Sequence, residues 1–218
     1  MSSKPILVVD DEKNIRLALS MSLEKLEIPV ETAASGEEAL EKLAQGDYGL
    51  MLLDLRMPGM DGMEVLRRVS EELPDLKVII ITAYGSIDLA VEAMKLGAVD
   101  FLQKPFDANQ VREMVARILE KKGEAQGYWD YLALAKKRIE EGYFEVAGVY
   151  AQKAVFLNPD RPETLNLLGG IAESTGNRRE AEQYYRAALA RYPHYTAAKL
   201  NLERLAGRTY TRQDIVWD

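Results

Sequence analysis

The sequence contains no cysteine, which excludes disulfide bonds and thiolate metal sites. Histidine occurs once, as His194 after a proline, where we expect a surface turn residue. No apolar run approaches the ~20 residues that a membrane-spanning helix needs, and the start, MSSKPILVVDD, lacks the apolar core of a secretory signal. From these absences we expect a cytoplasmic protein that does not bind a membrane.

Positive charge is scarce in the first part of the chain. Residues 1–122 carry 15 Lys and Arg against 22 Asp and Glu, whereas the remaining 96 residues carry 13 of each. Neither part has the basic face that contact with a phosphate backbone requires. We therefore expect no direct binding of nucleic acid.

Apolar residues in the first part form runs that are nearly continuous, as in strands buried on both faces of a parallel sheet. The predicted strands are Ile6–Val9, Leu50–Leu53 and Val78–Ile81, with weaker candidates at Val30–Ala33 and Phe101–Gln103. Segments with helical periodicity alternate with them, at Asn14–Leu26, Glu37–Ala44, Met63–Glu72, Ile87–Leu96 and Asn109–Lys121. Four of these helices have a predicted N-cap: Ser35, Asp61, Ser86 and Asp107. Five β–α units predict a doubly wound α/β domain with a five-stranded parallel sheet.

Polar residues stand at or just after the carboxyl ends of four of these strands, the edge where open parallel sheets bind ligands. They are Asp10, Asp11, Asp54, Thr82 and Lys104. Three crowded carboxylates repel one another without a cation, so the set predicts a site for phosphate and a metal. Two plainer interpretations remain open: the Asp10–Asp11 pair as a helix cap, and Thr82 as an ordinary β-branched strand residue.

Residues 4–122 resemble a response-regulator receiver domain, the phosphoacceptor part of a two-component system. The motifs VVDDE, LLDLRMPGMDGMEVL, ITAYGS and FLQKPF stand in that family's order and at its spacing. The resemblance covers somewhat more than half of the chain. It implies a flavodoxin-like fold and a histidine kinase as partner. Apart from catalysing its own phosphorylation and dephosphorylation, such a domain is not an enzyme.

The resemblance also implies residue roles. Asp54 would accept the phosphoryl group and, with Asp11, ligate Mg²⁺ directly, while Asp10 would hold the ion through water. The backbone carbonyl of Arg56 would be a further metal ligand. Lys104 would contact a phosphoryl oxygen, and the bond from Lys104 to Pro105 is a candidate cis peptide.

A readout is implied as well. Thr82 would donate to the phosphoryl group, and Phe101 would move into the space that this shift vacates. Phe101 as a plain core residue is an equally open interpretation. Arg56 and Tyr84 would flank the phosphoryl group and tune the rate at which water removes it.

A second domain follows a linker at residues 123–127, and its sequence repeats with a period of 34. Matching pairs include Gly142 with Gly176, Ala147 with Ala181 and Pro159 with Pro193. Residues 128–206 resemble tetratricopeptide repeats: two helix pairs and a capping helix. The predicted helices are Tyr128–Glu141, Phe144–Leu157, Glu163–Ser174, Arg178–Arg191 and Thr196–Leu205. So few repeats need support, which the receiver, a second copy or a partner could supply.

Such repeats bind a protein or peptide in a concave groove. Six residues on the first helices of the pairs are the groove candidates: Trp129, Leu132, Lys136, Asn166, Gly170 and Glu173. Trp129 at an inter-domain contact is an alternative. The tail, residues 207–218, has three open interpretations: disorder, packing on the last helix, or filling the groove of another copy in a homodimer.

The sequence thus predicts a response regulator that is phosphorylated on Asp54 and controls protein–protein contacts through its repeats, without binding DNA. One alternative is a phosphate sink that drains a histidine kinase by self-catalysed dephosphorylation. Another is a constitutive scaffold, against which the complete set of Asp54, Thr82 and Lys104 argues.

Overall fold

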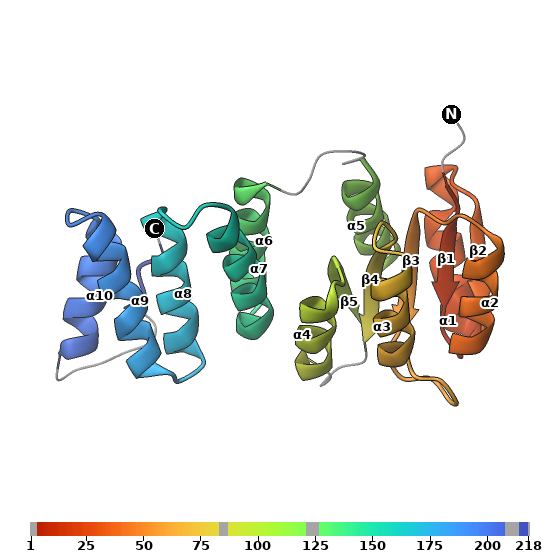
Figure 1. The fold of residues 1–218 in the computed structure, drawn as a ribbon, viewed down its shortest axis with the longest axis horizontal. Helices are drawn as coiled ribbons and strands as arrows, with labels where there is room; N and C mark the ends of the chain where they lie inside the picture. Colours follow the sequence, from red (N-terminus) through yellow and green to blue (C-terminus); the bar gives the residue numbers. More distant parts are fainter. Residues whose placement is uncertain (1–3, 83–86, 121–126, 208–213, 218) are drawn as a thin grey trace. The chain divides into compact units, whose positions relative to one another are not determined.

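The computed structural model describes residues 4–82, 87–120, 127–207 and 214–217 (Figure 1). The chain divides into two compact units, Met1–Gly123 and Glu124–Asp218. Within the described ranges, no helix has both the length and the apolar character that crossing a bilayer demands.

The first unit contains the predicted five-stranded parallel sheet, with strand order β2-β1-β3-β4-β5. The strands are β1 (Ile6–Val9), β2 (Val30–Ala33), β3 (Leu50–Asp54), β4 (Lys77–Thr82) and β5 (Asp100–Gln103). Three of them extend beyond the apolar runs because ladder pairing continues into polar residues. Asp54 pairs with Ile81, and Thr82 pairs with Gln103. Both residues at the site edge are therefore part of the ordered sheet.

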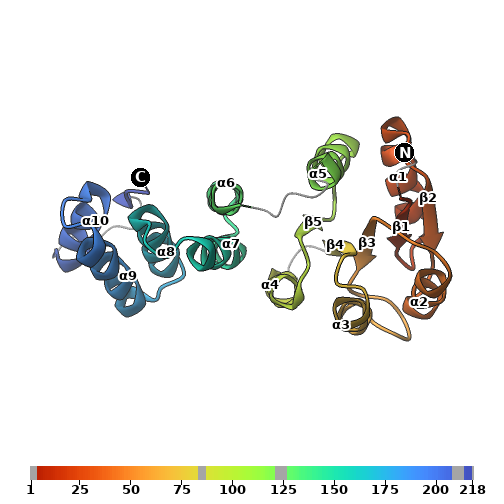
Figure 2. The same cartoon turned by 45° about the horizontal axis from the view of Figure 1, so that its top comes forward.

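Helices cover both faces of the sheet, with α1 and α5 on one face and α2, α3 and α4 on the other (Figure 2). They are α1 (Lys13–Leu23), α2 (Gly36–Gln45), α3 (Gly62–Glu72), α4 (Ile87–Leu96) and α5 (Ala108–Glu120). The core under α1 and α5 takes alternate residues of each strand, such as Ile6 and Val8, because successive strand side chains point to opposite faces.

The predicted helix Asn14–Leu26 is wrong in its last turn. Residues Glu24–Leu26 form a separate 3-10 helix, and Glu27 then adopts a left-handed backbone with φ of 53°. A residue with a left-handed backbone conformation ends a helix, because its dihedral angles cannot continue a right-handed one. The apolar periodicity of the sequence does not indicate such a residue.

Three of the four predicted N-caps are confirmed. The side chains of Ser35, Asp61 and Asp107 each accept a hydrogen bond from a backbone N–H in the first turn of the helix that follows. The fourth, Ser86, lies outside the described residues.

In the second unit, all the regular secondary structure of the described residues is helical. Its helices are α6 (Tyr128–Glu140), α7 (Phe144–Leu157), α8 (Pro162–Ser174), α9 (Arg178–Arg191) and α10 (Thr196–Ala206). Each helix packs on the next in sequence, and the starts and ends lie within one residue of those predicted.

The two helix pairs repeat the same turn. Gly142 and Gly176, 34 residues apart, have φ values of 82° and 92°, which a side chain would oppose. The residue after each glycine donates its backbone N–H to a carbonyl five residues back, at 2.8 Å from Tyr143 and 2.7 Å from Asn177. The sequence period is therefore also a period of the backbone.

Candidate functional site

Three carboxylates meet at the carboxyl edge of the sheet. One oxygen each from Asp10, Asp11 and Asp54 lies within 4.8 Å of the others. Asp10 is buried, Asp54 is 5% exposed and Asp11 is exposed to solvent. The parallel strands bring this about, because β1 and β3 are neighbours and end at the same edge.

Lys104 is the cation in contact with this cluster. Its Nζ lies 2.8 Å from Asp10 Oδ2 and 3.5 Å from Asp54 Oδ1, and it also lies 3.5 Å from Glu12 Oε1. Its backbone N–H donates to the carbonyl of Thr82 at 2.7 Å, which fixes the β5–α5 loop to the end of β4. The bond between Lys104 and Pro105 is cis, as predicted.

The electrostatics of the cluster disfavour its negative charge. Burial raises the pKa of Asp54 to about 6; Lys104 opposes that shift, and the neighbouring carboxylates of Asp10 and Asp11 add to it. Burial alone would lower the pKa of Lys104, but Asp10, Asp54 and Glu12 outweigh it and raise that pKa. An excess of carboxylates over ammonium groups therefore remains at this edge.

The donor set fits Mg²⁺. This ion prefers hard oxygen ligands and accepts one or two carboxylates while keeping several waters. Asp54 and the exposed Asp11 offer such oxygens, and the buried Asp10 forms an ion pair with Lys104. A divalent cation here would also relieve the repulsion that raises the pKa of Asp54.

The loop after Asp54 depends on a glycine. A Cβ at Gly62 would lie 2.1 Å from the carbonyl oxygen of Asp54, so only glycine lets α3 begin against the end of β3. The N–H of Gly62 donates to the carbonyl of Leu55 at 3.0 Å. Gly59 in the same loop has φ of 76°. Both glycines therefore serve the backbone of this loop.

The expected readout residues take different positions. Thr82 is buried at the end of β4, one residue beyond the partner of Asp54. Phe101 is 1% exposed on β5, so in this structure its ring is a core residue rather than an outward-facing one. Arg56 is exposed, and Tyr84 lies outside the described residues.

Two further residues of the site escaped the sequence analysis. Glu12 adds a carboxylate near Lys104, and Arg16 donates to the backbone carbonyls of Asp10 at 2.6 Å and Asp11 at 3.0 Å. Arg16 thus holds the acidic loop through its main chain. Its sequence signal is a position in the first turn of α1, which is common among helical arginines.

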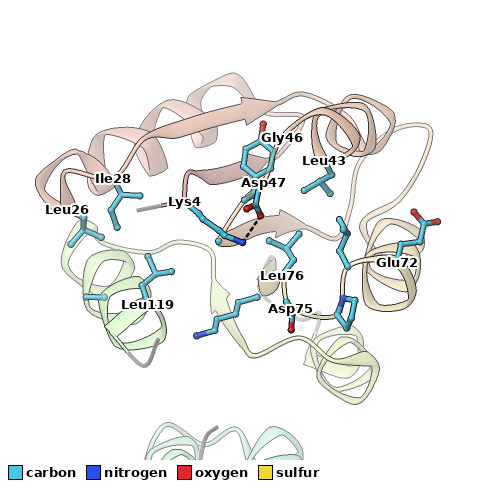
Figure 3. A pocket seen from close by; sticks show the side chains of 16 residues that line it. Lys4, Leu26, Ile28, Leu43, Gly46, Asp47, Glu72, Asp75, Leu76 and Leu119 are labelled. Atoms are coloured by element: carbon cyan, nitrogen blue, oxygen red, sulfur yellow. Dashed lines mark hydrogen bonds and ion pairs between the residues drawn. The ribbon is translucent and has the colours of Figure 1, made fainter. Parts of the chain in front are cut away.

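The first unit also has a cavity of about 790 Å³, which is unrelated to the acidic cluster (Figure 3). Its lining includes Lys4, Gly49 and Lys77, which stand at the amino ends of β1, β3 and β4. The cavity is therefore at the opposite edge of the sheet. The ion pair between Lys4 and Asp47 at its rim joins two exposed side chains, and much of the lining is apolar, such as Leu26 and Leu119.

The six predicted groove residues of the second unit lie in four kinds of environment. Trp129 is 61% exposed and Lys136 is half-buried, whereas Leu132 is buried in the helix packing. Asn166 and Gly170 contact the carboxyl-terminal segment of the same chain. Glu173 is buried and accepts hydrogen bonds from Arg204 and Tyr185, so its carboxylate is not offered to a ligand.

Comparison with known proteins places the similarity in the first unit. The family model of the response regulator receiver domain matches residues 6–116. The chain is 40% identical to response regulator protein PilR of Pseudomonas aeruginosa over 119 residues, which is 55% of this chain and 27% of PilR. It is 40% identical to the DNA-binding transcriptional regulator NtrC of Escherichia coli over 56% of this chain and 26% of NtrC. The chain thus spans about a quarter of these relatives.

Two shorter proteins match over nearly their whole length. Sporulation initiation phosphotransferase F of Bacillus subtilis is 39% identical over 119 residues, which cover 55% of this chain and 96% of that protein. The crystal structure of the receiver domain of NtrX from Brucella abortus has a TM-score of 0.52 and 35% identity, covering 53% of this chain and 98% of that one.

Proposed function

The chain belongs to the response regulator receiver family, and from that premise we propose that it is a phosphorylation-controlled adaptor. In this proposal Asp54 takes a phosphoryl group from a histidine kinase, and the helical unit carries the output by binding a protein. The observation that carries the proposal is the cluster of Asp10, Asp11, Asp54 and Lys104, joined in one chain to a second unit built of repeated helix pairs.

The carboxylate of Asp54 acts as the nucleophile. Its oxygen forms a P–O bond as the P–N bond of a phosphohistidine breaks, and the imidazole nitrogen keeps that electron pair. Lys104, within 3.5 Å of Asp54, neutralises an oxygen of the arriving group. Asp11 and Asp54 would hold Mg²⁺, with Asp10 next to them, and the ion would neutralise charge on the phosphoryl oxygens. We propose no enzymatic activity beyond this self-modification.

The proposed signal passes through β4 and β5. The Thr82 side chain lies next in sequence to the partner of Asp54, and the Thr82 carbonyl accepts from the N–H of Lys104. If the Thr82 hydroxyl turns toward the phosphoryl group, the end of β4 and the β5–α5 loop therefore shift together. Phe101 already fills the core beside these strands, so we propose that it responds by repacking rather than by entering from solvent.

The proposed output unit is a tetratricopeptide-type array. The 34-residue sequence period and the two equivalent glycine turns at Gly142 and Gly176 support that assignment. The unit carries 13 basic and 13 acidic residues from residue 123 onward, a balance that does not favour DNA. We therefore propose protein binding without DNA binding, in contrast to what the name of NtrC says of that relative.

The test is a pull-down from lysate with the full chain, with and without a beryllofluoride mimic on Asp54. We expect a partner whose recovery changes with the mimic, and no change in the Asp54→Ala variant. Recovery that ignores the mimic would refute the control that we propose.

The lifetime of the acyl phosphate distinguishes the phosphate sink from the adaptor. A phosphoryl group lost within seconds, with no partner captured, would support the sink. Persistence for minutes together with a captured partner would support the adaptor.

A further inference from the structure

The carboxyl-terminal segment 214–217 lies on the helical unit, next to α8 (Figure 1). Ile215 is 9% exposed, although it follows a polar stretch of the sequence. Main-chain and side-chain contacts both hold the segment, and they come from α7, α8 and α10. The last residues described are therefore a bound peptide within their own chain.

Two buried asparagines bind the main chain of Val216. Asn201 on α10 accepts from the Val216 N–H at 2.8 Å and donates to the Val216 carbonyl at 2.7 Å. Asn166 on α8 donates to the same carbonyl at 2.9 Å. All of these bonds are made to the main chain of Val216, so this part of the surface recognises a peptide backbone.

The asparagines are held in place from behind. Asn201 donates to Asn166 Oδ1 at 3.0 Å, and Arg204 lies 3.4 Å from Asn201 Oδ1. Arg204 in turn is fixed by two short bonds to the carboxylate of Glu173, which also accepts from Tyr185 at 2.8 Å. Because these side chains are locked by neighbours, the amide groups are already aligned for a ligand.

The residues on either side of Val216 supply side-chain recognition. The Trp217 ring stacks on Phe144 of α7, with centroids 6.5 Å apart and planes at 16°. The same ring covers Gly170 so closely that a Cβ there would lie 2.5 Å from Trp217 Cζ3. Together with the buried Ile215, these contacts select an aliphatic residue and an aromatic residue separated by any one residue.

We propose that this surface is a peptide-binding site and that segment 214–217 is its built-in competitor. The external ligand that fits is an extended protein segment carrying an aliphatic–any–aromatic triplet, which must displace Ile215, Val216 and Trp217 to bind. The proposal rests on the proposed function in one respect, that the helical unit binds a protein. A tethered competitor acts at an effective concentration on the order of mM, so the occupied site discriminates against weak ligands.

The test measures binding of a fluorescently labelled peptide of residues 211–218, TRQDIVWD, to full-length variants. Val216→Pro removes the N–H that donates to Asn201, and Trp217→Ala removes the ring from Gly170. Each variant should free the site and bind the peptide at least about tenfold more tightly than the wild type. Val216→Ala keeps the main-chain bonds, so its affinity for the peptide should remain within about twofold of the wild type.

Phe156→Ala is the matched control, since it removes an aromatic ring from an exposed position on α7. It should bind the peptide like the wild type, and circular dichroism should show every variant to be folded. Equal affinities for all five proteins, or no measurable binding to any, would overturn the proposal. A wild-type dimer that becomes monomeric on Val216→Pro would mean that the segment sits in a second copy, which overturns occupation within one chain.

The outcome is separable from that of the proposed function because no phosphoryl donor is present. Asp54→Ala should leave all peptide affinities unchanged. If the peptide results are as expected but partner capture ignores the beryllofluoride mimic, phosphorylation control fails and the self-occupied site stands. If partner capture responds to the mimic but the peptide affinities are all equal, the proposed adaptor function stands and the self-occupied site is refuted.

Discussion

Each unit of this protein buries a group of charged side chains, and the two groups differ in how their charges are compensated. In the receiver unit, Asp10 and Asp54 share a single ammonium group, that of Lys104. In the helical unit, the carboxylate of Glu173 is met by the guanidinium of Arg204 and by the Tyr185 hydroxyl. The first group has more carboxylates than ammonium groups, whereas the second pairs one carboxylate with one guanidinium.

This difference separates a ligand site from a supporting network. An under-compensated cluster at the edge of a sheet is destabilising until a cation or another positive group arrives. A compensated network costs stability only when one member is removed, and it can orient other groups, here Asn201. The comparison predicts opposite effects on stability. Neutralising Asp54 should stabilise the metal-free receiver unit, whereas removing the carboxylate of Glu173 should destabilise the helical unit.

The largest expected effect is on phosphorylation. Asp54→Asn should abolish incorporation of phosphate from a small-molecule phosphodonor, because the amide is not a nucleophile toward phosphorus. Intact-mass spectrometry reports the modification directly. Glu12→Gln is the matched control: it neutralises the exposed carboxylate 3.5 Å from Lys104 and should still allow phosphorylation. A modified Asp54→Asn protein would refute the assignment of the acceptor.

The second prediction concerns Glu173→Ala. Removing one member of a buried ion pair leaves Arg204 uncompensated and should lower the free energy of unfolding of the helical unit by about 3–5 kcal/mol. Both tryptophans, Trp129 and Trp217, belong to this unit, so tryptophan fluorescence during urea unfolding reports on it alone. A loss below about 1 kcal/mol would mean that the network is not a supporting one.

The third prediction contrasts two glycines. Gly62→Ala drives a Cβ against the backbone of Asp54 and should destabilise the receiver unit by about 3 kcal/mol, measured by hydrogen exchange of β3. At Gly170 the atoms nearest to an added Cβ all belong to the movable Trp217 ring, so Gly170→Ala should release the tail and leave the helices intact. Equal destabilisation of the two units would contradict the contrast.

The fourth prediction is a pH dependence of the metal-free receiver unit. Because folding raises the pKa of Asp54 from its ordinary value of 3.8 to about 6, ionising this carboxyl costs stability. The stability that the protonated carboxyl contributes is fully present below the unfolded pKa and is lost as the pH rises through about 6, on the order of 3 kcal/mol in total. Asp54→Asn should remove this part of the slope in chelator-treated protein, and Mg²⁺ should stabilise the wild type more than the variant. A slope that persists in Asp54→Asn would contradict it.

The smallest expected effect is that of an exposed pair. Lys4 and Asp47 lie 2.7 Å apart with both side chains largely in solvent, so Asp47→Asn should change the free energy of unfolding by less than about 0.5 kcal/mol. Chemical denaturation followed by circular dichroism is sufficient. A change as large as that of Glu173→Ala would mean that proximity, and not burial, sets the energy of an ion pair.

The parts of the fold that were predicted correctly are those that depend on residues close together in the sequence. The continuous run Ile6–Val9 gives a buried strand, Asp61 caps α3 three residues before its N–H partner, and Gly142 and Gly176 mark equivalent turns. The left-handed Glu27 was missed because no local pattern separates it from the helix before it. The site edge was predictable because parallel strands end together, which brought Asp10, Asp54 and Lys104 to one place.

The sequence by itself determined where strands, helices and turns form and which carboxylates share an edge, because these follow from periodicity and from the topology of parallel sheets. Tertiary structure alone decided that Glu173 pairs with Arg204, that Phe101 is buried, and that Asn201 and Asn166 hold Val216. Those contacts depend on how helices distant in sequence dock against one another. Docking is the sum of many weak packing terms, and no short motif encodes it.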